Sequence, residues 1–233
     1  MGRLRERRGI EVNLRSEPQM LEYKAIAFRI AEDRPRRVLD WGCGWGQVAK
    51  LLHDHGLDVT ALDYRPGRDQ GVEPLPRFPE IEAHLTPDPV LLPFETGSFD
   101  AVLSLGVLEH VADPDGSLEE IKRVLEPGGT FYVYKLPNRY SYLERLARLM
   151  GLYYHGANPD DAVYDKRSAI ALLAEHGFEI HEFRRTNMLP LTLEGRAAAR
   201  AAKAIWTANR ALAHVPALNM LATNLELVAI SPA

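Results

Sequence analysis

The chain has 233 residues, of which 46% are hydrophobic and 26% charged, and its formal net charge is −4. This length suits one well-packed domain better than two independent cores. No apolar stretch approaches the length that crosses a bilayer, so we expect a soluble protein without stable membrane insertion. The net negative charge gives no general attraction to a phosphate backbone, and we therefore expect no nucleic-acid partner.

Cys43 is the only cysteine in the sequence. It can form neither an internal disulfide nor a cysteine-built zinc site, which fits a reducing compartment. The first residues carry charge without the apolar core of a secretory signal, so we expect a cytoplasmic protein.

Basic residues gather in two places. An N-terminal group is typical of a solvated tail and consists of Arg3, Arg5, Arg7 and Arg8. A second group recurs on one face of an alanine-rich helical stretch and consists of Arg196, Arg200, Lys203 and Arg210. That face suits a membrane surface or an acidic substrate, and the exposed side of a packed helix explains it equally well.

The first part of the chain alternates between helical and strand patterns. Apolar residues recur at helical spacing near the N-terminus, and short apolar runs follow. Two of these runs and the helix between them form a βαβ unit, whose parallel strands need a right-handed crossover. The elements predicted here are a helix over 19–31, a strand over 37–40, a helix over 46–55, a strand over 58–63, an irregular surface segment over 67–79 and a short strand over 81–85.

The second part continues this alternation. Residues 99–106 form a nearly continuous apolar run, which is typical of a central parallel strand buried on both faces. A long, mostly helical insertion over 187–222 precedes the last strand. The other elements predicted are helices over 117–125, 142–152 and 166–176 and strands over 130–136, 178–184 and 224–231.

The most informative segment is 38–48, in which a buried strand turns through three glycines into a helix. Glycines let the backbone approach a ligand closely, and ligands of open α/β sheets lie beyond the carboxyl ends of strands. The spacing fails the dinucleotide fingerprint, because Gln47 stands where the third Gly or Ala is required. Asp40 would repel a pyrophosphate, whereas it suits a cofactor that presents an ammonium group beside a sulfonium.

This segment resembles the first motif of the class I S-adenosylmethionine-dependent methyltransferases, which has the form Asp-x-Gly-x-Gly-x-Gly. Further matches follow in the order of that family, and they are Asp63, Asp88 within 88–94, the segment 92–111 and the turn at 123–129. The resemblance implies a Rossmann-like methyltransferase fold, which is a doubly wound α/β sheet of seven mostly parallel strands. We expect one methyltransferase domain over 1–233, with an N-terminal helical segment over 1–35 and a small helical cap from insertions near 138–165 and 187–222.

The resemblance also implies the cofactor, S-adenosyl-L-methionine, and its site. The family's counterpart of Asp63 accepts hydrogen bonds from both ribose hydroxyls, and that of Asp88 reaches the adenine amino group. From the residues alone, each aspartate could instead stabilise a turn. The cofactor-binding residues that we predict are Asp40, Gly42, Cys43, Gly44, Gly46, Gln47, Asp63, Tyr64, Asp88, Leu105, Gly106, Val107 and His110.

Methyl transfer from a sulfonium requires in-line positioning, and a catalytic base is optional. His110 follows the fourth strand, beside the expected position of the methyl group, and is the candidate base for a hydroxyl or protonated amine. An isolated histidine is more often structural than catalytic. Cys43 and Trp45, which lie between the loop glycines, are expected to fill space and not to react.

The region after the fifth strand gathers amide, cationic and phenolic groups where acceptors bind. The acceptor-binding residues predicted from it are Lys135, Asn138, Arg139, Tyr142 and His155. The alternative is that the aromatic residues of this region are the packing face of the cap. A cap favours an enclosed pocket and a small-molecule acceptor, although its helices could also form homodimer contacts.

The sequence therefore predicts a methyltransferase that modifies oxygen, nitrogen or carbon of a small molecule. Two other functions remain open. One is a protein that binds S-adenosylmethionine without catalysis, and the other is a nucleotide-dependent oxidoreductase on the same topology.

Overall fold

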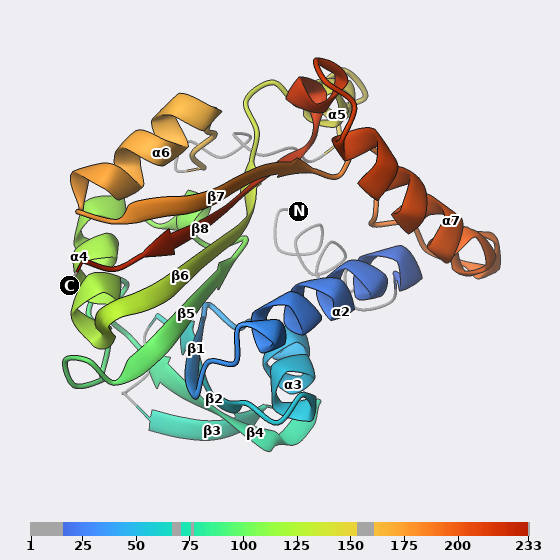
Figure 1. The fold of residues 1–233 in the computed structure, drawn as a ribbon. Helices are drawn as coiled ribbons and strands as arrows, with labels where there is room; N and C mark the ends of the chain where they lie inside the picture. The colour runs from blue at the N-terminus through green and yellow to red at the C-terminus, as the bar shows by residue number, and fades with distance from the viewer. Residues whose placement is uncertain (1–15, 67–70, 76, 153–160, 233) are drawn as a thin grey trace.

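A computed structural model describes residues 16–66, 71–75, 77–152 and 161–232 of the chain. Its centre is an eight-stranded sheet with helices on both faces (Figure 1). The strands lie in the order β3-β4-β2-β1-β5-β6-β8-β7. Their bounds are β1 Arg37–Trp41, β2 Asp58–Tyr64, β3 Gly71–Leu75, β4 Phe78–Thr86, β5 Phe99–Leu105, β6 Leu125–Pro137, β7 Glu179–Thr186 and β8 Asn224–Ile230.

Four of the seven neighbouring strand pairs are parallel, and they join β4, β2, β1, β5 and β6. The other three pairs are antiparallel and place β3 at one end of the sheet and β8 and β7 at the other. The chain leaves β1 in one direction toward β2 and later returns on its other side as β5. This reversal of strand order creates a ligand-binding crevice beyond the carboxyl ends of β1 and β5. The doubly wound, mostly parallel α/β fold is confirmed.

The number of strands differs from the predicted seven because 67–79 contains β3, although this segment was expected to be irregular. Pro74 gives up one backbone donor, which is tolerated because β3 forms the edge of the sheet. Leu75 is buried against Ala49, Ala61 and other residues of a small apolar cluster, and this packing fixes the strand.

Helices cover the sheet on both faces. Their bounds are α2 Glu17–Glu32, α3 Gln47–Asp54, α4 Pro114–Val124, α5 Tyr142–Leu149, α6 Lys166–Glu175 and α7 Arg196–Ala213, with short 3₁₀ turns η1 Leu108–His110 and η2 Leu218–Leu221. Several helices begin at the residues that physical chemistry favours. Asp113 caps α4 through the backbone N–H of Gly116, and Asp165 caps α6 in a reciprocal capping box with Ser168.

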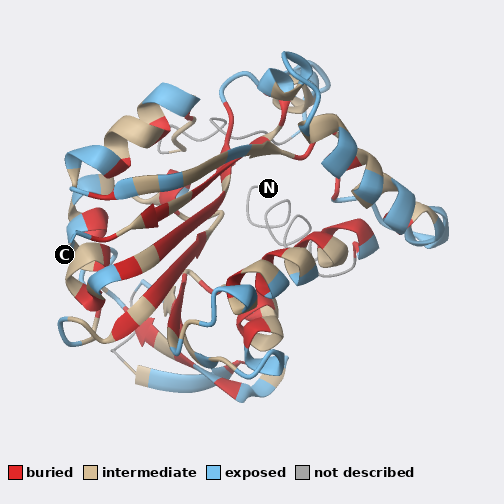
Figure 2. Cartoon of the chain, viewed as in Figure 1, coloured by how far each residue is buried: buried red, intermediate tan, exposed pale blue. Residues whose placement is uncertain are grey.

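The core divides according to the alternation of side chains along β6. Phe131 and Val133 face α4 and α6, whereas Tyr132 and Tyr134 face α2 and α3. The central strands are accordingly buried along most of their length (Figure 2).

The predicted insertion over 187–222 contains α7 and η2. α7 packs on α2, where Trp206 Nε1 donates to Glu22 Oε2 at 2.9 Å. α5 and η2 lie together near the ends of β6 and β7 (Figure 1). None of the helices in the described parts of the chain is long and apolar enough to cross a membrane.

Candidate cofactor and acceptor site

The glycine loop connects β1 to α3 at the crevice. Gly42 and Cys43 donate their backbone N–H groups to Leu62 O at 2.8 and 2.9 Å, which anchors the loop to β2. Gly46 has φ +75°, and a Cβ atom there would lie 2.1 Å from Leu75 Cδ1, so only glycine allows β3 to pack on the loop. Gly44 also has a positive φ, but a Cβ atom there would meet nothing within 4 Å. The backbone at Gly44 is therefore open to a ligand.

The side chains beside these glycines have different environments. Cys43 is buried, and burial raises the pKa of its thiol, so it fills space as predicted. Trp45 is exposed, which contradicts the same expectation for this residue. Gln47 is the first residue of α3 and is partly buried.

Asp40 lies on β1 directly before the loop and is only 3% exposed. Burial raises the pKa of its carboxyl group to about 7, and the nearby Asp63 raises it further, while a hydrogen bond from the Ala49 backbone opposes the shift. A cation in the crevice would favour the ionised carboxylate, because it would supply the opposite charge that this environment lacks.

Asp63 lies near the carboxyl end of β2. Its Oδ1 accepts a hydrogen bond from the Tyr64 backbone at 2.9 Å. Its Oδ2 lies 2.6 Å from Arg65 Nη1, but this ion pair lacks hydrogen-bond geometry, and Oδ2 is a buried acceptor with no hydrogen-bond partner among the described residues. Burial raises the pKa of Asp63, and the charge of Arg65 opposes this. The sequence analysis did not identify Arg65, although it follows the predicted site residues Asp63 and Tyr64 directly. Tyr64 is 44% exposed beside them.

Asp88 stabilises a turn after β4. Its Oδ1 accepts hydrogen bonds from the backbone N–H groups of Val90 and Leu91, both at 2.9 Å, and these bonds lower its pKa. The turn role that the sequence left open is therefore present. An additional contact of Asp88 with adenine remains a prediction.

The end of β5 forms the other wall of the crevice. Leu105, Gly106 and Val107 are all partly buried there, and the Gly106 backbone donates to Tyr134 O at 3.0 Å. His110, at the end of η1, has a 42% exposed side chain, and its Nδ1 lies 2.9 Å from Asp161 Oδ1. Asp161 was not predicted, because a loop residue 51 positions away carries no sequence pattern that links it to His110.

Several of the predicted acceptor residues make contacts inside the protein. Lys135 Nζ lies 4.6 Å above the ring of Tyr23. Asn138 is buried, and its side chain donates to the carbonyl groups of Met220 and Ala222 at 2.9 and 2.7 Å. The hydroxyl of Tyr142 donates to Met188 O.

Arg139 is half exposed, donates to Val163 O at 3.3 Å and lies 3.8 Å from Asp165. His155 lies outside the described residues. The side chains of Lys135 and Arg139 remain the ones best suited to meet an acceptor.

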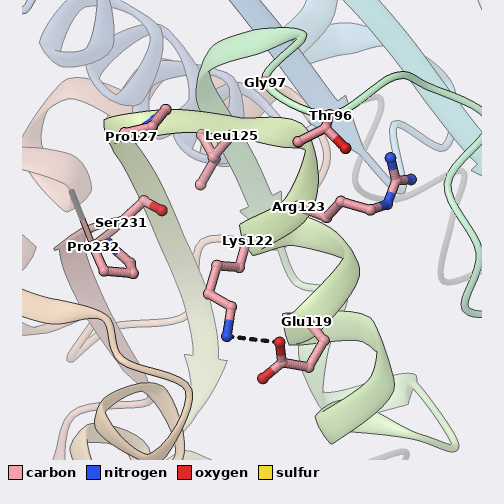
Figure 3. A pocket seen from close by; sticks show the side chains of 9 residues that line it. All are labelled: Thr96, Gly97, Glu119, Lys122, Arg123, Leu125, Pro127, Ser231 and Pro232. Carbon is pink, nitrogen blue, oxygen red and sulfur yellow. Dashed lines mark ion pairs between the residues drawn. The ribbon is translucent and has the colours of Figure 1, made fainter.

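Two cavities have been identified elsewhere. One of about 340 Å³ is lined by residues at the amino ends of β5 and β6, including Gly97 and Leu125, and by Pro232 after β8 (Figure 3). It therefore lies at the edge of the sheet opposite the glycine loop. The other, of about 230 Å³, lies between α2, β7 and α7 and is lined by Arg29 and Arg210 among other residues. In the described parts of the chain, no group of three or more His, Cys, Asp or Glu residues could hold a metal ion.

Residues 39–133 match the family model described as a methyltransferase domain. The chain contains a class I methyltransferase domain. This confirms the resemblance that the motifs from Asp40 to the turn at 123–129 indicated.

Among the curated relatives of this domain is a protein from Xanthomonas oryzae pv. oryzae, named ubiquinone biosynthesis O-methyltransferase. It is 33% identical over 121 residues, which are 50% of this chain and 48% of the relative. The chain thus aligns with about half the length of the curated relatives that it matches.

Solved structures show the same fold at lower sequence identity. The 1,6-didemethyltoxoflavin-N1-methyltransferase of Burkholderia thailandensis, solved with S-adenosylhomocysteine, has a TM-score of 0.56 at 20% identity, with 92% of this chain and 78% of that chain covered. A structure of the Haloferax volcanii Trm112 methyltransferase activator with a methyltransferase has a TM-score of 0.61 at 19% identity, with 97% and 94% covered. The methyltransferase domain and its fold are therefore consistent with each other.

Proposed function

We propose that the protein is an S-adenosylmethionine-dependent methyltransferase that acts on a small molecule. The observation that carries this proposal is the arrangement at the switch point of the sheet. A buried carboxyl group at Asp40, an open backbone at Gly44 and an unused carboxylate oxygen at Asp63 all lie at the carboxyl ends of two adjacent strands.

The chemistry of these groups fits S-adenosylmethionine. Asp40 would favour the ammonium and sulfonium charges, and a phosphate would be repelled there. Asp63 Oδ2 would accept a hydrogen bond from a ribose hydroxyl, and Gly44 leaves room for the ligand to lie against the backbone. Both observations concern the described residues themselves and agree with the domain family.

The bound cofactor would supply an activated methyl group on a sulfonium. The protein's part is to orient that group and an acceptor in line, and such positioning can account for much of the rate enhancement. The walls formed by the glycine loop and by Leu105–Val107 would hold the cofactor, while Lys135 and Arg139 lie where an acceptor would enter.

Two of the relatives described above are named for methylation of small molecules, one on oxygen and one on nitrogen. We infer a small-molecule acceptor here as well. The proposal includes a cytoplasmic location and no nucleic-acid partner. A homodimer formed through the cap helices remains a prediction, which sedimentation of the purified protein would test.

The test is calorimetric titration with S-adenosylhomocysteine. We expect Asp63→Ala to weaken binding by about 10- to 100-fold, because a buried ribose hydroxyl would lose an acceptor worth about 1.5–3 kcal/mol. Asp58→Ala is the matched control, since Asp58 is exposed at the other end of the same strand. Tight binding of NADH by the wild-type protein, with no response to S-adenosylhomocysteine, would overturn the proposed function.

A further inference from the structure

His110 is placed between two buried carboxyl groups. Its Nδ1 lies 2.9 Å from Asp161 Oδ1, and its Nε2 lies 3.8 Å from Glu109 Oε1. The side chains of Asp161 and Glu109 are only 5% and 2% exposed, whereas that of His110 is 42% exposed. The ring therefore has buried carboxyl groups on its inner side and presents the rest of its surface outward.

The loop that carries Asp161 is anchored to the crevice. Ala162 donates its backbone N–H to Glu109 O at 2.8 Å, which joins this loop directly to η1. Two further backbone bonds join it to the end of β6: Tyr164 N to Pro137 O at 3.0 Å, and Arg139 N to Tyr164 O at 2.7 Å. Asp161 is thus held beside His110 by the same segments that form the acceptor side of the crevice.

The distances assign different roles to the two ring nitrogens. A hydrogen bond at 2.9 Å to a carboxylate requires a proton on Nδ1. A neutral imidazole with Nδ1–H carries its lone pair on Nε2, and the 3.8 Å to Glu109 exceeds hydrogen-bond distance. A carboxylate that fixes the tautomer in this way is the arrangement by which histidine bases are oriented in other enzymes.

We propose that Asp161 is a positioning residue that holds His110 in the Nδ1–H tautomer, so that Nε2 removes the proton from a hydroxyl acceptor. This inference rests on the proposed function and narrows it to acceptors with an O–H group. A carbon nucleophile or a free amine would need no such base.

The proton balance is complete. The acceptor O–H proton passes to His110 Nε2, and the oxygen electron pair forms the new bond to the methyl carbon. The electron pair of the broken carbon–sulfur bond stays on sulfur, which becomes a neutral thioether. The imidazolium, stabilised by Asp161 and Glu109, then releases its proton to solvent.

His176 is a useful contrast within the same protein. Its Nδ1 lies 2.8 Å from Glu119 and its Nε2 lies 3.0 Å from Asp115, so both nitrogens are held by carboxylates. Burial lowers the pKa of His176, but these two hydrogen bonds outweigh burial and raise it. A ring with both nitrogens donating has no lone pair for catalysis, which distinguishes this surface ion pair from His110.

The first test is the tautomer of His110, measured by ¹⁵N–¹H NMR of the histidine rings at a pH where His110 is neutral. We expect Nδ1–H in the wild-type protein and a shift to the Nε2–H form, which isolated imidazole favours, in Asp161→Ala. Asp115→Ala is the matched control, since it should change the signals of His176 and leave those of His110 unchanged. An Nε2–H tautomer in the wild-type protein, or a tautomer unchanged in Asp161→Ala, would overturn the proposal.

The second test is methyl transfer to a panel of phenols, alcohols and amines, followed as release of S-adenosylhomocysteine. We expect turnover of a hydroxyl acceptor whose kcat falls about 10- to 100-fold in Asp161→Ala and about 100-fold or more in His110→Ala. Binding of S-adenosylhomocysteine should be unchanged in Asp161→Ala. Turnover that is restricted to amines, or full activity in Asp161→Ala, would contradict the dyad, whereas a protein with the expected tautomer that fails to bind S-adenosylhomocysteine would contradict the proposed function instead.

Discussion

Asp40 is the residue at which stability and function conflict most directly. It is nearly inaccessible to solvent, and burial raises the pKa of its carboxyl group to about 7. The unligated protein therefore has an ionised group in an unfavourable environment at neutral pH. A bound cation would relieve this cost, so the instability of the free site would become affinity for the cofactor.

The pH dependence of stability follows from the same shift. Because the folded-state pKa lies above the unfolded value, the stabilising contribution of protonated Asp40 is complete below about pH 4 and is lost as the pH rises through 7. We expect Asp40→Asn to remove this loss, which is on the order of 2–4 kcal/mol, and to weaken binding of S-adenosylhomocysteine. Urea unfolding at pH 5 and pH 8 checks the first effect, with Asp58→Asn as the exposed control. Equal differences between the two pH values in wild type and Asp40→Asn would refute this account of Asp40.

At the scale of elements, the sequence predicted the strands and helices whose patterns are local. β1, β2, β5 and the helices between them have continuous apolar runs and clear ends. β3 was not predicted, because Gly71 and Pro74 are typical of irregular segments and because its stability depends on pairing with β4 and on burial of Leu75. An edge strand of this kind is specified by tertiary packing that no local pattern reveals.

The end of β6 shows a similar limit. Asn138 was predicted to bind an acceptor, but its side chain joins β6 to η2 through the carbonyl groups of Met220 and Ala222. These partners are more than 80 positions away, so the sequence could not indicate them. The same holds for Asp161, which reaches His110 only through the fold.

We expect Asn138→Ala to lower the free energy of unfolding by about 3 kcal/mol, because buried groups left without partners cost about 1–3 kcal/mol each. Asn219→Ala removes a single bond of 3.2 Å to Ala213 O and should cost about 1 kcal/mol. Urea denaturation of both variants provides the comparison. If Asn138→Ala were no more destabilising than Asn219→Ala, Asn138 would not be the structural connection that we describe.

At the scale of the whole molecule, the order of the strands determines where the site lies. The reversal at β1 and β5 opens the crevice, and the adjacent carboxyl ends bring Asp40 and Asp63 beside Gly44. The cofactor half of the site could be predicted because each of its parts is a short motif at the end of one strand. The acceptor half could not, because it is assembled from the ends of β6 and β7, the loop at 161–165 and the cap helices, which are distant in sequence.

The most direct test of the central claim is a crystal structure of the protein with S-adenosylhomocysteine. We expect the ligand to lie across the carboxyl ends of β1 and β2, with its backbone contacts at Gly44, its ribose hydroxyls on Asp63 and its ammonium group on the side of Asp40. A ligand bound instead in the cavity between α2 and α7, or at the opposite edge of the sheet, would contradict the account.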